Sequence, residues 1–386
     1  MKSWFSIFTD ELKLILQDKS ILLTCLVAPI LYAFFIGSIY KEKEVTQIPI
    51  AVVDFDHTAL SRKVSDLVDT NEKVKVYGHY SSMGNAMVSF NKLEVQGILI
   101  IPKDFQKKTM NLDGSTIQLI LNNTKFLTSN EINKGVQQVI LTVSAGVRMK
   151  YFISNKIPVE IAKQQAQPIM PVIKSVYNAT NNYGDFLLPI LLILILQQTL
   201  IISFGQSAIH ELQHGYLKHM HNASFFDFMK IFSAKTFYYI LLYVAYFFIF
   251  YKFIFPYYFL NFKGSLFLHL ILSTLFILVV LEYTIFLASF FKTEIGWTEI
   301  MAFSTYPLFL VSGYSWPVES MPQFIQYIAN LLPSTPFFKV FNMLSVEGAD
   351  FDQIRSEFIH LLLLLLFGYF LLYIRYRFLH SKKVKS

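Results

Sequence analysis

The chain has little of what small secreted domains and soluble enzymes depend on. It holds a single cysteine, so its domains must fold without an internal disulfide. Only 15% of its 386 residues are charged and 54% are hydrophobic, whereas a soluble protein of this length carries more charge. No GxxxxGK(S/T) motif occurs, so nucleotide binding through a P-loop is excluded. We expect the chain to bind no cofactor of its own.

The hydrophobic residues are concentrated in runs long enough to cross a bilayer. A spanning helix needs about 20 mostly apolar residues, because the hydrocarbon layer is about 30 Å thick and each residue rises about 1.5 Å. The sequence predicts six such helices, at residues 20–40, 186–209, 232–256, 264–291, 298–315 and 357–376. The run at 298–315 is the shortest. We therefore expect a polytopic α-helical membrane protein.

A polar stretch the size of a domain, residues 41–184, separates the first span from the second. Strand-like runs alternate with helical patterns in it, which predicts a small soluble α/β sheet. The predicted strands cover residues 48–53, 73–77, 97–102 and 117–121.

Two further regions complete the organisation. Residues 1–19 carry apolar side chains at helical spacing among charged ones, which predicts an amphipathic helix in the plane of the headgroups. Residues 185–380 hold the second to sixth spans. Between the last two spans, residues 313–356 contain four prolines and are typical of short re-entrant or interfacial helices on the outer side.

Basic residues in short loops predict the orientation of the spans. Arg375, Arg377 and Lys382 place the C-terminus in the cytoplasm, and six spans then place the N-terminus there too. The domain at 41–184 is then extracytoplasmic, since long domains translocate regardless of charge. This topology accounts for the net charge of +7, and we expect no nucleic-acid partner.

One motif points to an enzyme. His210, Glu211 and His214 form an HExxH pattern, which on a helix directs two imidazoles to one zinc ion with the glutamate as general base. A zinc-dependent membrane metalloprotease is therefore an alternative hypothesis. The longer metzincin pattern is not met, because Leu217 and Met220 stand where it needs glycine and histidine. A histidine-rich cytoplasmic loop is the simpler interpretation.

A second pattern follows the first predicted strand. Asp54, Asp56 and Thr58 match the DxDxT of haloacid-dehalogenase phosphotransferases, whose first aspartate is a nucleophile and a metal ligand. That chemistry needs further acidic ligands, which the sequence does not place. Aspartates that cap the next helix give the same letters, and we favour the cap.

Glu282 stands in the middle of the fourth predicted span. A carboxyl group at that depth is a candidate functional site by default. A neutral glutamic acid, hydrogen-bonded to a neighbouring helix, is an equally good interpretation.

Motif-like segments lie along nearly the whole chain. Asp54 and Asp56, with Ser61 and Arg62, are similar to a VDxDxSxxSR segment, and residues 97–105 are similar to GxIxIPxxF. The most specific match, to SG…P…MP, comprises Ser312, Gly313, Pro317, Met321 and Pro322. Together these segments resemble the permease subunit of bacterial type-2 ATP-binding-cassette (ABC) exporters, in the subgroup with a large periplasmic domain between the first two spans.

The resemblance implies a role for the residues that match. His210, Glu211, His214 and Gly215 fall in the cytoplasmic coupling helix, here residues 210–222, on which the ATPase acts. Lys235 falls at a Gly-Lys pair of the family, with Ala234 in place of the glycine. The residues of the SG…P…MP match form a re-entrant outer gate.

The resemblance also implies an activity and partners. The chain is expected to be a non-catalytic permease that exports a hydrophobic or amphipathic substrate, driven by separate ABC ATPase subunits that hold the ATP and Mg²⁺. A homodimer in the bacterial inner membrane, surrounded by lipid, is the simplest assembly. The outer domain either hands cargo to a periplasmic adaptor protein or only gates the exit.

Overall fold

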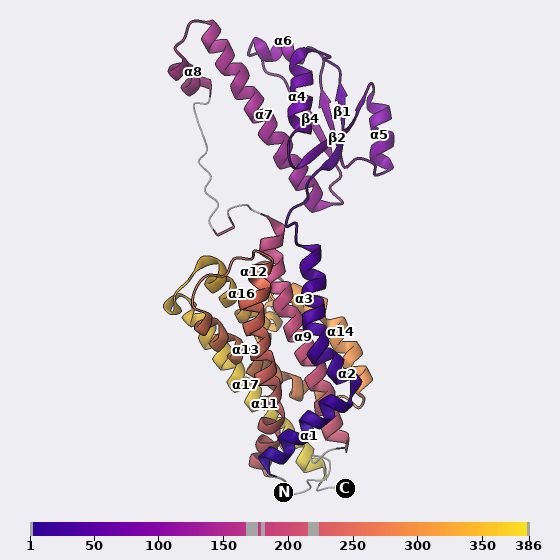
Figure 1. Ribbon diagram of the computed structural model, residues 1–386, viewed down its shortest axis with the longest axis vertical. Coiled ribbons are helices and arrows are strands. Elements are labelled where there is room, and N and C mark those ends of the chain that lie inside the picture. The colour runs from indigo at the N-terminus through magenta and orange to yellow at the C-terminus, as the bar shows by residue number, and fades with distance from the viewer. Residues whose placement is uncertain (1–2, 167–176, 179–181, 215–223, 384–386) are drawn as a thin grey trace. The chain divides into compact units, whose positions relative to one another are not determined.

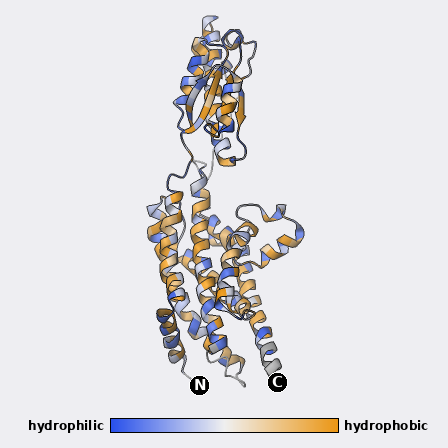
Figure 2. Cartoon of the chain, turned by 90° about the vertical axis from the view of Figure 1, so that its right-hand side faces the viewer, coloured by the Kyte–Doolittle hydropathy of each residue, from blue (hydrophilic) through white to orange (hydrophobic). Residues whose placement is uncertain are grey.

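The computed structural model describes residues 3–166, 177–178, 182–214 and 224–383. The chain divides into two compact units (Figure 1). We call residues 1–43 with 175–386 the helical unit, and residues 44–174, which lie within the predicted outer domain, the α/β unit. Figure 2 shows that hydrophobic residues predominate along the long helices of the helical unit.

The α/β unit is built on a four-stranded sheet with the order β2-β1-β3-β4. β1 pairs in parallel with both β2 and β3, and β4 runs antiparallel to β3 at the edge. The strands are β1 (Ile48–Asp54), β2 (Val74–Tyr80), β3 (Gly97–Ile101) and β4 (Gln118–Leu121). The helices are α4 (Ala59–Asp69), α5 (Met83–Asn91), α6 (Phe105–Met110), α7 (Phe126–Ser154) and α8 (Val159–Ala166). The predicted α/β sheet is confirmed.

Alternation along β1 explains why the sheet is covered on both faces. Successive side chains of a strand point to opposite sides. Ile50 and Val52 enter a core shared with α4 and α7, whereas Ala51 and Val53 enter a second core under α5. The α/β unit therefore has an apolar core of its own on each side of the sheet.

The DxDxT segment between β1 and α4 is a capping network. Asp54 accepts hydrogen bonds from the amides of Asp56 (2.9 Å) and His57 (3.1 Å) and from the Ser61 hydroxyl (2.6 Å). Thr58 is the N-cap of α4 and accepts from the Ser61 amide (3.3 Å). Both Asp54 oxygens are thus occupied by donors, as the capping interpretation predicts.

Asp54→Ala is expected to destabilise the α/β unit by about 2 kcal/mol, because two amides and a part-buried hydroxyl lose their acceptor. Asp54→Asn keeps one oxygen acceptor and should cost less. The urea concentration at which this unit becomes protease-sensitive, in the purified chain, measures the effect. Asp113→Ala, at an exposed turn, is the control. Equal midpoints for Asp54→Ala and the control would refute the capping account.

The helical unit contains the remaining elements. At its N-terminal side lie α1 (Trp4–Gln17), α2 (Lys19–Leu22), a π-helical turn (Leu23–Val27) and α3 (Ala28–Ile39). After the α/β unit come α9 (Tyr183–His214), α11 (Phe225–Ile249), a π-helical turn (Phe250–Ile254), α12 (Phe255–Tyr257), α13 (Leu266–Ala288) and α14 (Glu294–Val311). A 3₁₀ turn (Val318–Ser320), α15 (Gln323–Leu331), α16 (Ser334–Asn342), a π-helical turn (Met343–Glu347) and α17 (Phe351–Lys383) complete it.

Five helices in the described part of the chain are long and apolar enough to cross a membrane. They cover Lys19–Ile39, Tyr183–Gln213, Phe225–Tyr257, Leu266–Ala288 and Phe351–Arg377. They correspond to all the predicted spans except 298–315, and three of them extend well beyond the predicted bounds. The predicted span at 298–315 is a helix, α14, but its 18 residues include Glu294 and Glu299 and it is not among the five.

Contacts between helices show the direction in which each one runs. Arg375, near the end of α17, donates a hydrogen bond to the carbonyl of Ser289, which follows α13 (2.7 Å). α13 and α17 therefore run the same way, and the chain between them must return along the unit.

α14 supplies this return. At one end Trp297 donates to the Ile201 carbonyl (3.2 Å), and farther along Gln198 donates to the Met301 carbonyl (3.1 Å). Beyond its last residue, the Tyr314 ring stacks on Phe186 at the start of α9 (4.8 Å between centroids). α14 thus lies antiparallel to α9 and traverses the helical unit despite its lower hydrophobicity.

Candidate functional site

The first helix carries a charged residue on its buried face. Ile7, Glu11 and Ile15 recur every four residues, so they point to the same side of α1, and all three are buried. Ser3 caps the start of α1 by accepting a hydrogen bond from a first-turn amide (3.2 Å). Asp18 ends α1 in an extended conformation and caps α2, so that the chain turns between the two helices.

α1 packs across the beginning of α11. The Trp4 indole donates to the Ser233 hydroxyl (3.2 Å), and Trp4 with Ile7 packs against Ile231 and Ala234. Figure 1 shows α1 at the end of the helical unit where the last residues of α17 also lie. We call this the α1 end. The packing brings the buried face of α1 toward Lys235, one residue beyond Ala234.

Four side chains from three helices form a buried polar group at the α1 end, which we call the ion cluster. Lys235 of α11 forms salt bridges with Glu11 of α1 and with Glu211 of α9 (3.2 Å). Ser207, one turn before Glu211 on α9, donates its hydroxyl to the other carboxylate oxygen of Glu11. The side chain of Glu11 is fully buried, and those of Lys235 and Glu211 are each 8% exposed.

The ion cluster ties together helices that are distant in the sequence. Taking charges out of water is costly, and their mutual attraction offsets this cost only when every partner is in place. Removing one member of such a group typically costs 3–5 kcal/mol, because an uncompensated charge remains buried. The cluster therefore makes the position of α1 depend on the ends of α9 and α11.

The predicted coupling residues lie at the same end of the unit. His210, Glu211 and His214 belong to the last turns of α9, which continues through them without a break, and not to a separate helix. Gly215 and the rest of the predicted segment 210–222 lie outside the described residues. Glu211 is engaged by Lys235, and the described residues contain no group of three His, Cys, Asp or Glu that would hold a metal ion. Nothing in this arrangement favours the zinc protease.

Glu282 lies in the interior of α13. Its side chain is buried, and neither carboxyl oxygen has a hydrogen-bond partner within the described ranges. Gly368 of α17 leaves the space for it, because a Cβ at that position would stand 2.3 Å from the Glu282 carboxyl. Glu282 therefore stays a candidate polar site between two spanning helices.

The predicted outer-gate residues form the turn from α14 to α15. Ser312 ends α14 and donates its hydroxyl to the Phe309 carbonyl (2.7 Å). Gly313 has a φ of +87°, which favours glycine, and its Cβ-free face lies against Val318. The other three residues flank the next helices: Pro317 precedes the 3₁₀ turn, Met321 follows it, and Pro322 is the N-cap of α15. The short helices expected between the last two spans are present, and a gating role stays a prediction.

The sequence placed Glu211 correctly at this end but missed the partnership with Glu11 and Lys235. A signal for Glu11 was present, since it falls between Ile7 and Ile15 on the apolar stripe of an amphipathic helix. A carboxylate on such a stripe needs a buried partner. The partner itself was invisible, because Lys235 is 224 residues away.

No curated protein matches the chain at a significant level. The chain does match the family described as ABC-2 family transporter protein, over residues 19–375. That match includes all five long apolar helices, α14 and the α/β unit. Permeases of this family are in general non-catalytic transport subunits that associate with ABC ATPase subunits. The chain is thus a multi-pass membrane protein that belongs to the ABC-2 transporter family.

Proposed function

We propose that this chain is the membrane-spanning half of an ATP-driven exporter that moves a hydrophobic or amphipathic substrate outward. The observation that carries the proposal is the ion cluster, which joins α1 to the ends of two spanning helices. The absence of a P-loop from the sequence requires that the ATPase be another polypeptide.

The ion cluster gives a physical route for coupling. ATP binding would draw the two ATPase subunits together and push on the segment that follows α9, residues 215–222. Because α1, α9 and α11 are held by shared buried charges, a push on one of them moves all three as a body. Such rigid-body motion opens a path between spanning helices without unfolding any of them.

Six crossings are part of the proposal. α14 lies antiparallel to α9 over most of its length, so a membrane that contains α9 also contains α14. Its polar residues are tolerated at that depth if its outward face avoids lipid. Six crossings place both termini on the cytoplasmic side of a bacterial inner membrane and the α/β unit on the outer side.

The assembly we propose is a two-fold homodimer with two ATPase subunits. One copy supplies half of the wall of a path, and closed two-fold symmetry is the commonest way in which identical chains complete such a wall. Lipid covers the apolar faces of the other spanning helices. The α/β unit is free to meet a periplasmic adaptor protein or to gate the exit.

Site-specific photocrosslinking tests the ATPase partnership. Benzoylphenylalanine at Phe226, which is 83% exposed at the start of α11, should capture an ABC ATPase subunit identifiable by mass spectrometry. The same crosslinker at Phe259, 82% exposed beyond α12, is the matched control and should not. Deletion of residues 215–222 should abolish the capture. Capture of the ATPase from Phe259 but not from Phe226 would reverse the proposed orientation.

A further inference from the structure

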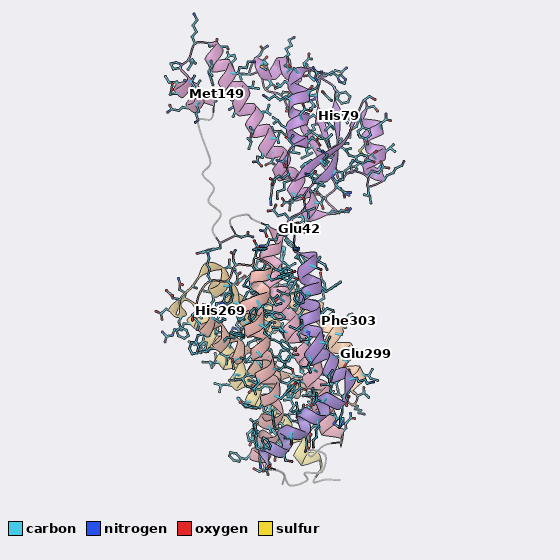
Figure 3. The ribbon with its side chains drawn as sticks, viewed as in Figure 1. Glu42, His79, Met149, His269, Glu299 and Phe303 are labelled. Carbon is cyan, nitrogen blue, oxygen red and sulfur yellow. The ribbon has the colours of Figure 1, made fainter. Side chains whose placement is uncertain are left out.

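α14 presents two different faces. One face packs against α9 through the fully buried Trp297, whose indole nitrogen donates to the Ile201 carbonyl (3.2 Å). The opposite face is exposed and consists of Ile295, Glu299, Phe303, Tyr306 and Leu310, spaced three to four residues apart. We call it the α14 face. Figure 3 labels Glu299 and Phe303 on this helix, at the edge of the helical unit.

Glu299 lies on the membrane side of the ion cluster. Its neighbour Thr298 accepts a hydrogen bond from Gln206 of α9 (2.8 Å). Gln206 precedes Glu211 by five residues, which is about 7–8 Å along a helix, in the direction of the bilayer centre. Glu299 has no hydrogen bond or ion pair with any residue that the structure describes, and its side chain is exposed.

Lipid is a poor neighbour for this face. A carboxylate on a spanning helix is strongly unfavourable against hydrocarbon, and such residues face the interior of a bundle or a water-filled path. The aromatic rings beside it are unusually open, with Phe303 82% and Tyr306 68% exposed. A helix with an acidic group and two open rings on one face has the groups that bind a cation: a negative charge and π-faces.

We propose that the α14 face lines the substrate path and that Glu299 selects an amphipathic organic cation, a positively charged centre on an apolar body. This inference rests on the proposed function. Phe303 lies one turn beyond Glu299 and Tyr306 two turns beyond, so a cation held at the carboxylate has its apolar groups against the rings. In a two-fold dimer a second copy contributes a second Glu299 to the same path. Two carboxylates in a low-dielectric path raise the local concentration of cations and repel anions.

Tetraphenylphosphonium and tetraphenylborate are suitable probes, because they have nearly the same shape and opposite charge. Binding to the purified permease, measured by equilibrium dialysis without ATP, should favour the phosphonium by at least tenfold. Glu299→Gln should lose at least tenfold in phosphonium affinity, and Glu299→Asp should retain part of it. Glu319→Gln, an exposed glutamate beyond the other end of α14, is the control and should bind as the wild type does.

Several outcomes would overturn the inference. They are absence of phosphonium binding to the wild-type chain, equal binding of the two probes, and unchanged affinity in Glu299→Gln. Stronger dimerisation of Glu299→Gln with unchanged cation binding would mean that this face only packs against a second copy. Each variant must keep the wild-type thermal midpoint, which the isosteric Gln favours.

The same probes separate this inference from the proposed function. Reconstitution with the ATPase then measures ATP-driven phosphonium transport in proteoliposomes. Glu299-dependent binding without ATP-driven transport would support the cation site and count against the exporter. ATP-driven transport of another substrate, with no effect of Glu299→Gln on any cation, would leave the exporter standing and refute the site.

Discussion

Lys235→Met is expected to abolish ATP-driven transport and to destabilise the helical unit by about 3–5 kcal/mol. Methionine fills most of the space of the lysine stem but cannot balance a charge. Glu11 and Glu211 would then share a buried site as two carboxylates without their common cation. The thermal midpoint of the purified chain and transport by reconstituted vesicles measure the two effects. Lys252→Met, at an exposed position on α11's π-helical extension, is the control and should change the midpoint little.

A triple variant separates stability from coupling. Replacing Glu11 and Glu211 with leucine in the Lys235→Met background removes every charge of the ion cluster together. Apolar replacement of a whole buried ionic group is often neutral or stabilising, so the midpoint should recover. Transport should stay low, because the shared charges that move α1 with α9 are gone. Recovery of both properties would mean that the cluster only stabilises the fold.

Gly205→Ala is expected to lower transport and stability by driving α9 away from α14. A Cβ at Gly205 would lie 2.1 Å from the indole of Trp297, whose ring is fully buried and held by its hydrogen bond to Ile201. Neither helix can yield without losing packing elsewhere, and overpacking of this kind costs about 1–3 kcal/mol. The loss should appear in the thermal midpoint and, if α14 lines the path, in the rate of transport.

The Gly205 prediction has a matched control and a rescue. Gly146, in the middle of α7, has nothing within 4 Å of its Cβ position, so Gly146→Ala should be neutral or slightly stabilising. Trp297→Leu removes the obstructing ring and should cost stability by itself. Combined with Gly205→Ala it should cost less than the sum of the two single changes, because the clash disappears. Strict additivity would show that the two residues do not meet.

Local patterns carried most of the fold. The alternation in residues 48–53 predicted β1 to within one residue, and long apolar runs predicted five membrane-spanning helices, because both signals lie within one element. α14 was harder, since its polar residues lower the very property by which spans are recognised. Its course along the unit emerges only from contacts such as that of Trp297 with Ile201, which join different helices.

The candidate site was predictable only in part. Glu211 was assigned through the resemblance of its segment to a coupling helix, and α9 indeed places it at the α1 end. Glu11 looked like a member of a polar helix face, although its spacing from Ile7 and Ile15 put it on the buried one. Lys235 gave no local sign of burial at all. Ion pairs between residues some two hundred positions apart depend on how helices pack, and sequence periodicity does not report that.

Cysteine accessibility in intact cells tests the central claim most directly. The native Cys25 is fully buried and should give little background. A cysteine in place of exposed Lys230, beside the ion cluster, and one in place of exposed Lys103, in the α/β unit, report the two locations. We predict that a membrane-impermeant maleimide labels position 103 in cells whose inner membrane is intact, and labels position 230 only after that membrane is opened. Labelling of both positions from the same side would contradict the exporter mechanism.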